Sequence, residues 1–317
     1  MDSTSEEIVS SPKFRIITTL KYILFNQADL DPPQNDVKDW QNQHETNLAL
    51  HAQRLQKSAE AFGWNDLATH IQQGGPSLLE QYLLQAAQNQ SKNDPSLDPE
   101  AGSFRMFRTR LEISNTGSIT VTITAMTPAS QPISLLPHET SVFNPPPSQS
   151  PPPIVSDPSP ESLCQLGVDT QATASTLFTN HKTSYRAPYD TARSRSQSPQ
   201  LTPTTPPTKA EVLLFNPQRE ITEASFSTVY FFRGGQWITP HATCGGNLGV
   251  TRRRALKGGF CVEGVVTLPS SGAGPLQSKK QSEETFGGGQ PWQIQHGEIV
   301  WLSNAVRGFF KARVALI

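Results

Sequence analysis

The chain has 317 residues, which is enough for one or two domains of ordinary size, and we expect two. Its 26 Lys and Arg nearly balance its 27 Asp and Glu, and the basic residues form no long run, so the sequence offers no electrostatic footprint for nucleic acid. The three cysteines are odd in number and lack CxxC spacing, which predicts reduced thiols and no metal site. The N-terminus is polar, and no run of about 18 apolar residues occurs, so we expect a cytoplasmic protein without a membrane partner.

The first third of the chain predicts a small α+β domain over residues 1–127. It begins with a run rich in β-branched residues, which is typical of a strand. Two segments with apolar residues near helical spacing follow and predict amphipathic helices. Two alternating runs separated by Ser114-Asn115-Thr116-Gly117 then predict a hairpin. The expected bounds are 16–22 for the first strand, 46–62 and 77–88 for the helices, and 107–113 and 118–125 for the hairpin strands.

Proline, serine and glycine dominate three later segments. Prolines accumulate between residues 128 and 160 and leave few ladder donors and few apolar side chains, so we expect residues 128–165 to be an interdomain linker with an unstructured insert. The segments 194–208 and 270–289 are expected to be solvated loop insertions within the second domain.

The second domain, over residues 166–317, predicts short antiparallel strands mixed with helices, which favours an α+β, barrel-like fold over a doubly wound sheet. Glycines surround one predicted helix, and a Gly-Gly turn joins two of the predicted strands. The expected strands are 175–180, 211–215, 228–232, 237–239 and 298–302, and the expected helices are 185–193 and 250–257.

Three groups along this second domain could together hold pyridoxal phosphate. Lys182 offers an amine for the aldehyde of the cofactor, and Glu223, at a strand end, offers a carboxylate for its ring nitrogen. The turn Gly249-Val250-Thr251 opens a predicted helix, so its backbone N–H groups and the helix dipole suit a phosphate. A lysine in an apolar pocket beside another cation would have a lowered pKa, which the chemistry of an amine near neutral pH requires.

The motifs around these groups resemble those of the class IV pyridoxal-phosphate family, which includes branched-chain and D-amino acid aminotransferases and aminodeoxychorismate lyase. The first stretch runs from His181-Lys182-Thr183 through Arg186 to Tyr189-Asp190-Thr191-Ala192-Arg193, and the second is Ile221-Thr222-Glu223-Ala224-Ser225. Two positions, Ala224 and Thr228, depart from the Gly and Asn that the family commonly shows. These departures affect the turn more than the chemistry.

The resemblance implies a two-domain fold with a small N-terminal α+β domain and a larger C-terminal barrel-like domain, and it implies a homodimer. By the same resemblance Lys182 forms the Schiff base with the cofactor, Arg186 lies beside it and Glu223 holds the ring nitrogen. The phosphate is assigned to two turns and to one arginine of the first domain, which suits it because a guanidinium binds phosphate oxygens in pairs. These phosphate residues are Gly249, Val250, Thr251, Asn304, Ala305 and Arg54.

A second resemblance favours one reaction among those of the family. The early Ile17-Thr18-Thr19-Leu20-Lys21-Tyr22 and the late Asn304 to Gly308 resemble the lyases more than the aminotransferases. They favour an enzyme that converts aminodeoxychorismate to 4-aminobenzoate and pyruvate, with Lys182 also moving the proton. A class IV aminotransferase for branched-chain or D-amino acids or amines is the alternative, and an inactive binding homologue is a third. The substrate carries carboxylates, and the candidate residues to bind them are Lys21, Arg108, Arg110 and Arg307. Each of these could equally be a surface charge.

Overall fold

The computed structural model describes residues 3–25, 34–93, 104–126, 163–197, 199–202, 204–269 and 292–316. Contacts between residues divide the chain into two compact units. The first unit is Met1–Ile133 together with His181–Tyr185, and the second is Ser134–Asn180 together with Arg186–Ile317. No helix among the described residues is long and apolar enough to cross a bilayer.

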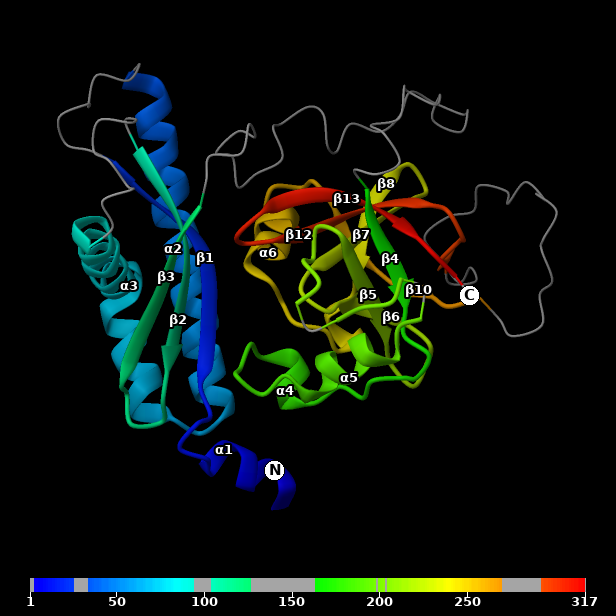
Figure 1. The fold of residues 1–317 in the computed structure, drawn as a ribbon, viewed down its shortest axis with the longest axis horizontal. Coiled ribbons are helices and arrows are strands. Elements are labelled where there is room, and N and C mark those ends of the chain that lie inside the picture. Colours follow the sequence, from blue (N-terminus) through cyan, green and yellow to red (C-terminus); the bar gives the residue numbers. More distant parts are fainter. Residues whose placement is uncertain are drawn as a thin grey trace. The chain divides into compact units, whose positions relative to one another are not determined.

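The first unit is a three-stranded antiparallel sheet with two long helices packed against it (Figure 1). Its strand order, β1-β2-β3, follows the chain. The strand, the two helices and the hairpin that the sequence predicts are confirmed, and most are longer than predicted. The elements are α1 (Ser3–Ser10), β1 (Ile16–Phe25), α2 (Gln34–Ala61), α3 (Asn65–Asn93), β2 (Phe104–Ile113) and β3 (Ile119–Met126).

The two faces of β1 have different environments. Thr18 and Tyr22 are buried on the face that the helices cover, because the Thr18 hydroxyl contacts His51 of α2 and the Tyr22 hydroxyl donates to Glu80 of α3. Thr19 and Lys21, which alternate with them, point to the opposite face, since side chains alternate along a strand. The helix α2 packs through an apolar stripe whose members are Leu48, Ala52, Leu55, Ala59 and Phe62.

The helix α3 is kinked rather than continuous. Gly75 has φ 51° and ψ −143°, a conformation that glycine adopts readily because it has no Cβ atom. Pro76 follows, and its fixed φ and missing N–H suit the first turn of a new helical segment. The predicted helix 77–88 therefore corresponds to the part of α3 after the kink.

The second unit is built on an eight-stranded mixed sheet with the order β6-β5-β4-β13-β12-β7-β8-β9 (Figure 1). A separate two-stranded sheet joins β10 and β11. The elements are β4 (Cys164–Val168), α4 (Leu177–Asn180), α5 (Ala187–Arg195), β5 (Ala210–Phe215), β6 (Ile221–Ala224), β7 (Thr228–Arg233), β8 (Gln236–Pro240), η4 (Ala242–Cys244), α6 (Val250–Lys257), β9 (Val262–Gly264), β10 (Val266–Thr267), β11 (Trp292–Gln293), β12 (Ile299–Asn304) and β13 (Gly308–Val314).

Apolar side chains fill both faces of this sheet. One core receives residues from strands along the sheet, among them Leu213, Val229 and Leu302, as a curled sheet allows. On the opposite face α5 packs on β5 through Tyr189, and α6 packs near Tyr230. Every residue of β5 is buried, as expected for a strand covered on both faces. This mixed α+β arrangement agrees with the predicted fold class.

The segment 175–180, which the sequence predicts as a strand, contains the short helix α4 instead. The Thr176 hydroxyl accepts a hydrogen bond from the Phe178 backbone N–H at 3.2 Å, and the Thr176 carbonyl accepts from Asn180. A threonine that caps a first turn in this way outweighs the strand preference of its β-branched side chain. The strand prediction is therefore wrong at this position.

The low-complexity segments have different outcomes. Within 194–208, α5 extends to Arg195 and Leu201 is buried, so this segment is partly packed rather than wholly solvated. The strand β4 begins at Cys164, inside the range expected to be linker. The rest of 128–165, apart from Leu163, lies outside the described residues, as does all of 270–289. The three cysteines are free thiols, as predicted.

Candidate active site

The segment that contains Lys182 is attached to the start of β1 by backbone hydrogen bonds. The Ile17 N–H donates to the Lys182 carbonyl at 2.8 Å, and the Ser184 N–H donates to the Arg15 carbonyl at 2.9 Å. Thr183 is thereby paired with Ile16 as an antiparallel bridge. Lys182 thus belongs to the first unit by its contacts, although the chain enters and leaves this segment from the second unit.

This pairing determines on which face of the sheet the side chains of His181 and Lys182 lie. His181 lies on the helix-covered face, where its ring contacts the Ser58 hydroxyl at 3.1 Å and packs edge-on against Phe62. Burial lowers the pKa of His181. Because neighbours alternate in an extended segment, Lys182 lies with Ile17 on the opposite face.

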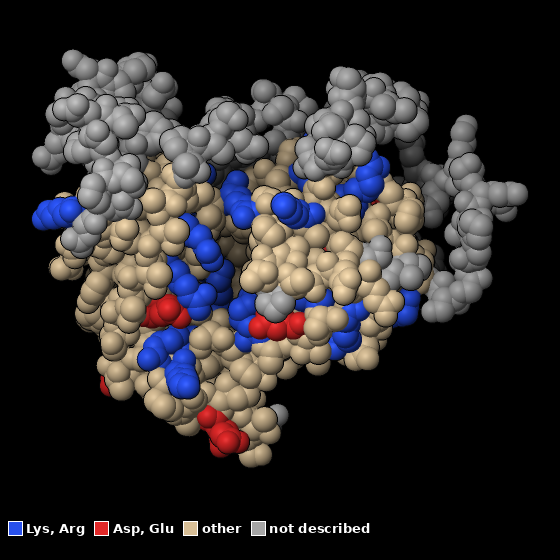
Figure 2. Space-filling view, in the orientation of Figure 1, with Lys and Arg blue, Asp and Glu red and all other residues tan. Residues whose placement is uncertain are grey.

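Three of the predicted substrate residues lie on this same face. Lys21 of β1 is directly opposite Arg108 of β2, and Arg110 is two residues further along β2 toward the end of the sheet where Lys182 lies. Arg108 is exposed, and Arg110 forms an ion pair with Glu112 at 2.9 Å. Burial lowers the pKa of Lys21. Figure 2 shows basic side chains gathered over β1 and β2, and we call Lys21, Arg108 and Arg110 the basic face.

Arg54 lies on the helix-covered side of β1, away from the basic face. Its guanidinium donates to the Thr18 hydroxyl and lies 3.4 Å from His51 Nδ1, while the same histidine nitrogen is 2.6 Å from the Thr18 hydroxyl. These contacts fix one edge of the guanidinium. The structure therefore gives Arg54 a defined place on α2.

In the second unit, Glu223 is a buried carboxylate at the end of β6 with two donors on one oxygen. The Tyr189 hydroxyl donates to Oε1 at 2.8 Å, and the backbone N–H of Asn247 donates to the same oxygen at 3.0 Å. Glu223 is only 8% exposed. The two donors hold the carboxylate in one orientation. The sequence motif contains Tyr189, but its role as a donor to Glu223 depends on a tertiary contact and was not predicted.

Arg186 and the helix α5 pack against the hairpin loop that follows Glu223. The Arg186 guanidinium donates to the Ser225 carbonyl at 3.0 Å and lies over the ring of Phe226 at 4.3 Å. Arg193, two turns along the helix, donates to the Ser225 hydroxyl at 3.0 Å. The motif after Lys182 thus ties α5 to the hairpin. The contacts of Arg186 fix this loop, and its assignment to the cofactor stays a prediction.

The glycine-rich turn before α6 lies against β6 and leads into a helix N-terminus. A Cβ atom on Gly246 would come within 2.7 Å of the Thr222 carbonyl, so only glycine permits this close approach. Gly249 precedes the first helical residue, Val250, and no side chain caps it. The first N–H groups of α6 therefore have no intrahelical partner and suit an anion.

The second predicted phosphate turn is joined to this helix start. The Thr251 hydroxyl is 2.9 Å from the Ser303 hydroxyl, and Ser303 is 2.8 Å from the hydroxyl of Tyr230. Asn304 accepts from the N–H groups of Val306 and Arg307, which builds the turn between β12 and β13. The structure thus brings Thr251 and Asn304 into one region. Ala305 and Arg307 lie in the same turn, which belongs to the second unit.

Arg254 adds a positive group one turn into α6. Its side chain is buried, and its Nη1 has no hydrogen-bond partner among the residues that the structure describes. Burial lowers the pKa of Arg254, because desolvation disfavours its charged form. Long side chains in a helix lean toward its N-terminus, and an anion there would compensate this charge. The sequence signal is a run of three arginines directly after the glycine turn.

One protein-family model matches this chain. The family model described as "Amino-transferase class IV" matches residues 36–270, which is most of the chain. The chain belongs to the class IV aminotransferase family. This class IV protein has its Lys182 segment, its β6 acid and its glycine turn inside the matched range, whereas Asn304 and Ala305 lie beyond it.

Individual relatives are more distant. A Schizosaccharomyces pombe protein named "Putative aminodeoxychorismate lyase" is 29% identical over 213 residues, which cover 67% of this chain and 68% of that protein. A solved structure from Mesorhizobium loti, a "Putative amino-acid aminotransferase", is 20% identical with a TM-score of 0.50, over 95% of this chain and 100% of the other. A 4-amino-4-deoxychorismate lyase from Pseudomonas aeruginosa is 12% identical with a TM-score of 0.46, over 96% and 87%. The Mesorhizobium likeness concerns the fold alone.

Proposed function

We propose that this protein is a pyridoxal-phosphate-dependent lyase that converts 4-amino-4-deoxychorismate to 4-aminobenzoate and pyruvate, a step of folate precursor synthesis. The observation that supports it best is the basic face, because Lys182 shares that sheet face with Lys21, Arg108 and Arg110. A substrate with two carboxylates needs positive groups beside the reactive lysine. The name of the Schizosaccharomyces pombe relative points in the same direction.

The residues of the second unit fit the polar parts of the cofactor. The uncapped start of α6, with Gly249, Val250 and Thr251, offers N–H groups and a hydroxyl for the phosphate. The buried Nη1 of Arg254 favours a nearby anion. Glu223 offers a carboxylate to the ring nitrogen, and its donors Tyr189 and Asn247 hold it in one orientation.

When bound, the cofactor supplies a ring that withdraws electrons from the substrate carbon. Lys182 would hold it covalently through its amine and, once released, would take the ring proton of the substrate. Glu223 would keep the ring nitrogen protonated. The two groups that donate to its carboxylate hold it in place for this role.

The basic face would bind the substrate carboxylates. Arg108 is exposed and Lys21 lies directly opposite it, so the two could take one carboxylate together. Arg110 already pairs with Glu112, and a second carboxylate there would have to compete with that ion pair. We therefore assign the main contact to Arg108 and Lys21. As the family resemblance implies, we also expect a homodimer, which sedimentation would test.

The deciding experiment supplies aminodeoxychorismate to the purified protein and measures 4-aminobenzoate and pyruvate. The proposal predicts both products in equal amounts, without any keto acid. Borohydride reduction followed by peptide mass analysis should place a pyridoxyl group on Lys182. Amino transfer that depends on a keto acid, with neither product formed, would identify an aminotransferase instead. A protein that takes up no pyridoxal phosphate at all would be a non-catalytic homologue.

A further inference from the structure

A buried carboxylate that the proposed chemistry does not use lies directly beneath the hairpin loop after Glu223. Glu211 is on β5 and is fully buried. It stands within the apolar run Ala210–Phe215, where an ionisable residue is costly unless its charge is compensated. Such a residue requires a specific set of partners.

Three consecutive residues of the loop donate to this carboxylate. The Ser225 hydroxyl donates to Oε2, the Ser227 hydroxyl donates to Oε1 at 2.9 Å, and the backbone N–H of Phe226 donates as well. The Ser225 N–H also donates to the Val212 carbonyl at 3.0 Å. One carboxylate therefore fixes the whole loop to β5.

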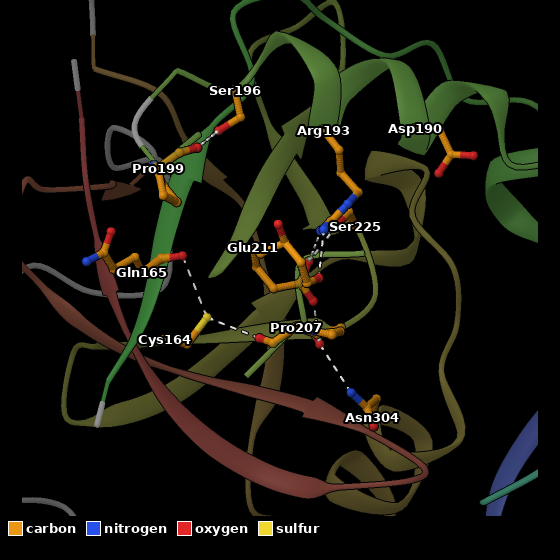
Figure 3. A network of polar contacts seen from close by, with 12 residues as sticks. Cys164, Gln165, Asp190, Arg193, Ser196, Pro199, Pro207, Glu211, Ser225 and Asn304 are labelled. Atoms are coloured by element: carbon orange, nitrogen blue, oxygen red, sulfur yellow. Dashed lines mark hydrogen bonds and ion pairs between the residues drawn. The ribbon is translucent and has the colours of Figure 1, made fainter. Parts of the chain in front are cut away.

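The same carboxylate links the loop to two further elements. Arg193 of α5 lies 3.8 Å from Glu211 Oε2 and donates to the Ser225 hydroxyl (Figure 3). On the other side, the Asn304 side-chain amide donates to the Ser227 hydroxyl at 3.4 Å. In Figure 3, Arg193 and Asn304 approach this centre from opposite directions. Glu211 thus connects α5, the loop and the turn between β12 and β13.

We propose that Glu211 is a positioning residue, which holds the loop 225–227 and thereby sets where Glu223 and Asn304 lie for the cofactor. The inference rests on the proposed function, because it concerns the two ends of bound pyridoxal phosphate. Glu223 is two residues before Ser225, and Asn304 contacts Ser227, so both predicted cofactor residues share this one support. Removal of the support would loosen both together.

The test compares two isosteric changes in the second unit, Glu211→Gln and the control Glu298→Gln. Glu298 also accepts from an arginine, Arg233 at 2.8 Å, and from a backbone N–H, that of Gln295, but it does not contact the loop. Pyridoxal phosphate is titrated into each apoprotein, and amide hydrogen exchange is measured across 223–228. We expect Glu211→Gln to lower the affinity for pyridoxal phosphate about tenfold and to speed exchange in the loop, because the amide nitrogen of glutamine cannot accept a hydrogen bond from the loop.

The control should change the affinity less than about twofold. Equal affinity losses in the two variants would overturn the inference, because a general loss of packing would then explain them. Faster loop exchange with unchanged cofactor affinity would also overturn it. If the wild type itself binds no pyridoxal phosphate, the proposed function fails and the inference fails with it. If the wild type binds and Glu211→Gln binds equally well, only the inference fails.

Discussion

The two units support their candidate residues in different ways. In the second unit, Glu223, Thr251 and Asn304 are each tied by hydrogen bonds to a neighbouring element. In the first unit, the basic face exposes Arg108 to solvent, and backbone hydrogen bonds to β1 place the Lys182 segment. Preorganised groups are suited to a ligand that stays bound, whereas exposed side chains can adapt to one that comes and goes. The difference is therefore consistent with the proposed roles, in which the residues of the second unit fix the polar groups of the cofactor and the basic face binds an exchanging substrate.

The largest effect should come from Lys182→Ala, because no other residue can replace an amine that is both carrier and base. We expect a loss of lyase turnover of about a thousandfold or more. The exposed lysine of α2 offers a matched control, Lys57→Ala, which should keep full turnover. Initial rates of 4-aminobenzoate release measure both. Turnover within tenfold of the wild type in Lys182→Ala would remove this lysine from the chemistry.

The next effect concerns stability and pH. Burial raises the pKa of Glu211 from 4.5 to about 7, and Arg193 and the loop donors only partly oppose this. Between these values the folded protein holds a proton that the unfolded chain has released, so the free energy of unfolding falls as pH rises through this range. Glu211→Gln removes the titration. The wild type should therefore lose about 3 kcal/mol at most relative to this variant from pH 4.5 to 7. Urea unfolding measures the difference, and parallel pH curves would contradict it.

Much of this arrangement could be predicted from local sequence, and the exceptions have physical causes. Val250–Lys257 has the predicted bounds because glycines flank it on both sides. The glycine-rich turn before this helix could be predicted from the same glycines. In contrast, the donor to Glu223 and the pairing of the Lys182 segment with β1 are contacts between residues far apart in the chain. No local pattern encodes such contacts.

One residue and one helix show what the sequence could and could not reveal. Glu211 was detectable in principle, because a carboxylate in the middle of an apolar strand is unusual. The helix α4 was not, because its threonine cap competes with a β-branched composition that favours a strand. The strand propensity of the threonines is outweighed by this cap. The cap depends on the conformation that the neighbouring residues impose.

Each unit contains a tyrosine hydroxyl that donates to a glutamate, so the effect of losing this hydrogen bond can be compared between the units. Tyr189→Phe removes the hydrogen bond to Glu223, so we expect kcat to fall about tenfold with little change in KM. The matched control is Tyr22→Phe, which removes a bond of the same 2.8 Å length to Glu80 in the first unit. It should alter thermal stability but not kcat. Equal losses of kcat in both variants would mean that the bond to Glu223 has no special role.

The smallest effect should be on substrate binding at the basic face. Arg108→Ala removes one exposed charge, and exposed charges are screened by solvent, so we expect KM to rise about fivefold with kcat nearly unchanged. Added salt should raise the KM of the wild type toward that of the variant, because it screens the same attraction. Arg313→Ala, an exposed arginine on β13, should leave KM unchanged. If Arg108→Ala instead lowered kcat at constant KM, Arg108 would act on the transition state, and the assignment of the basic face to substrate binding would have to be revised.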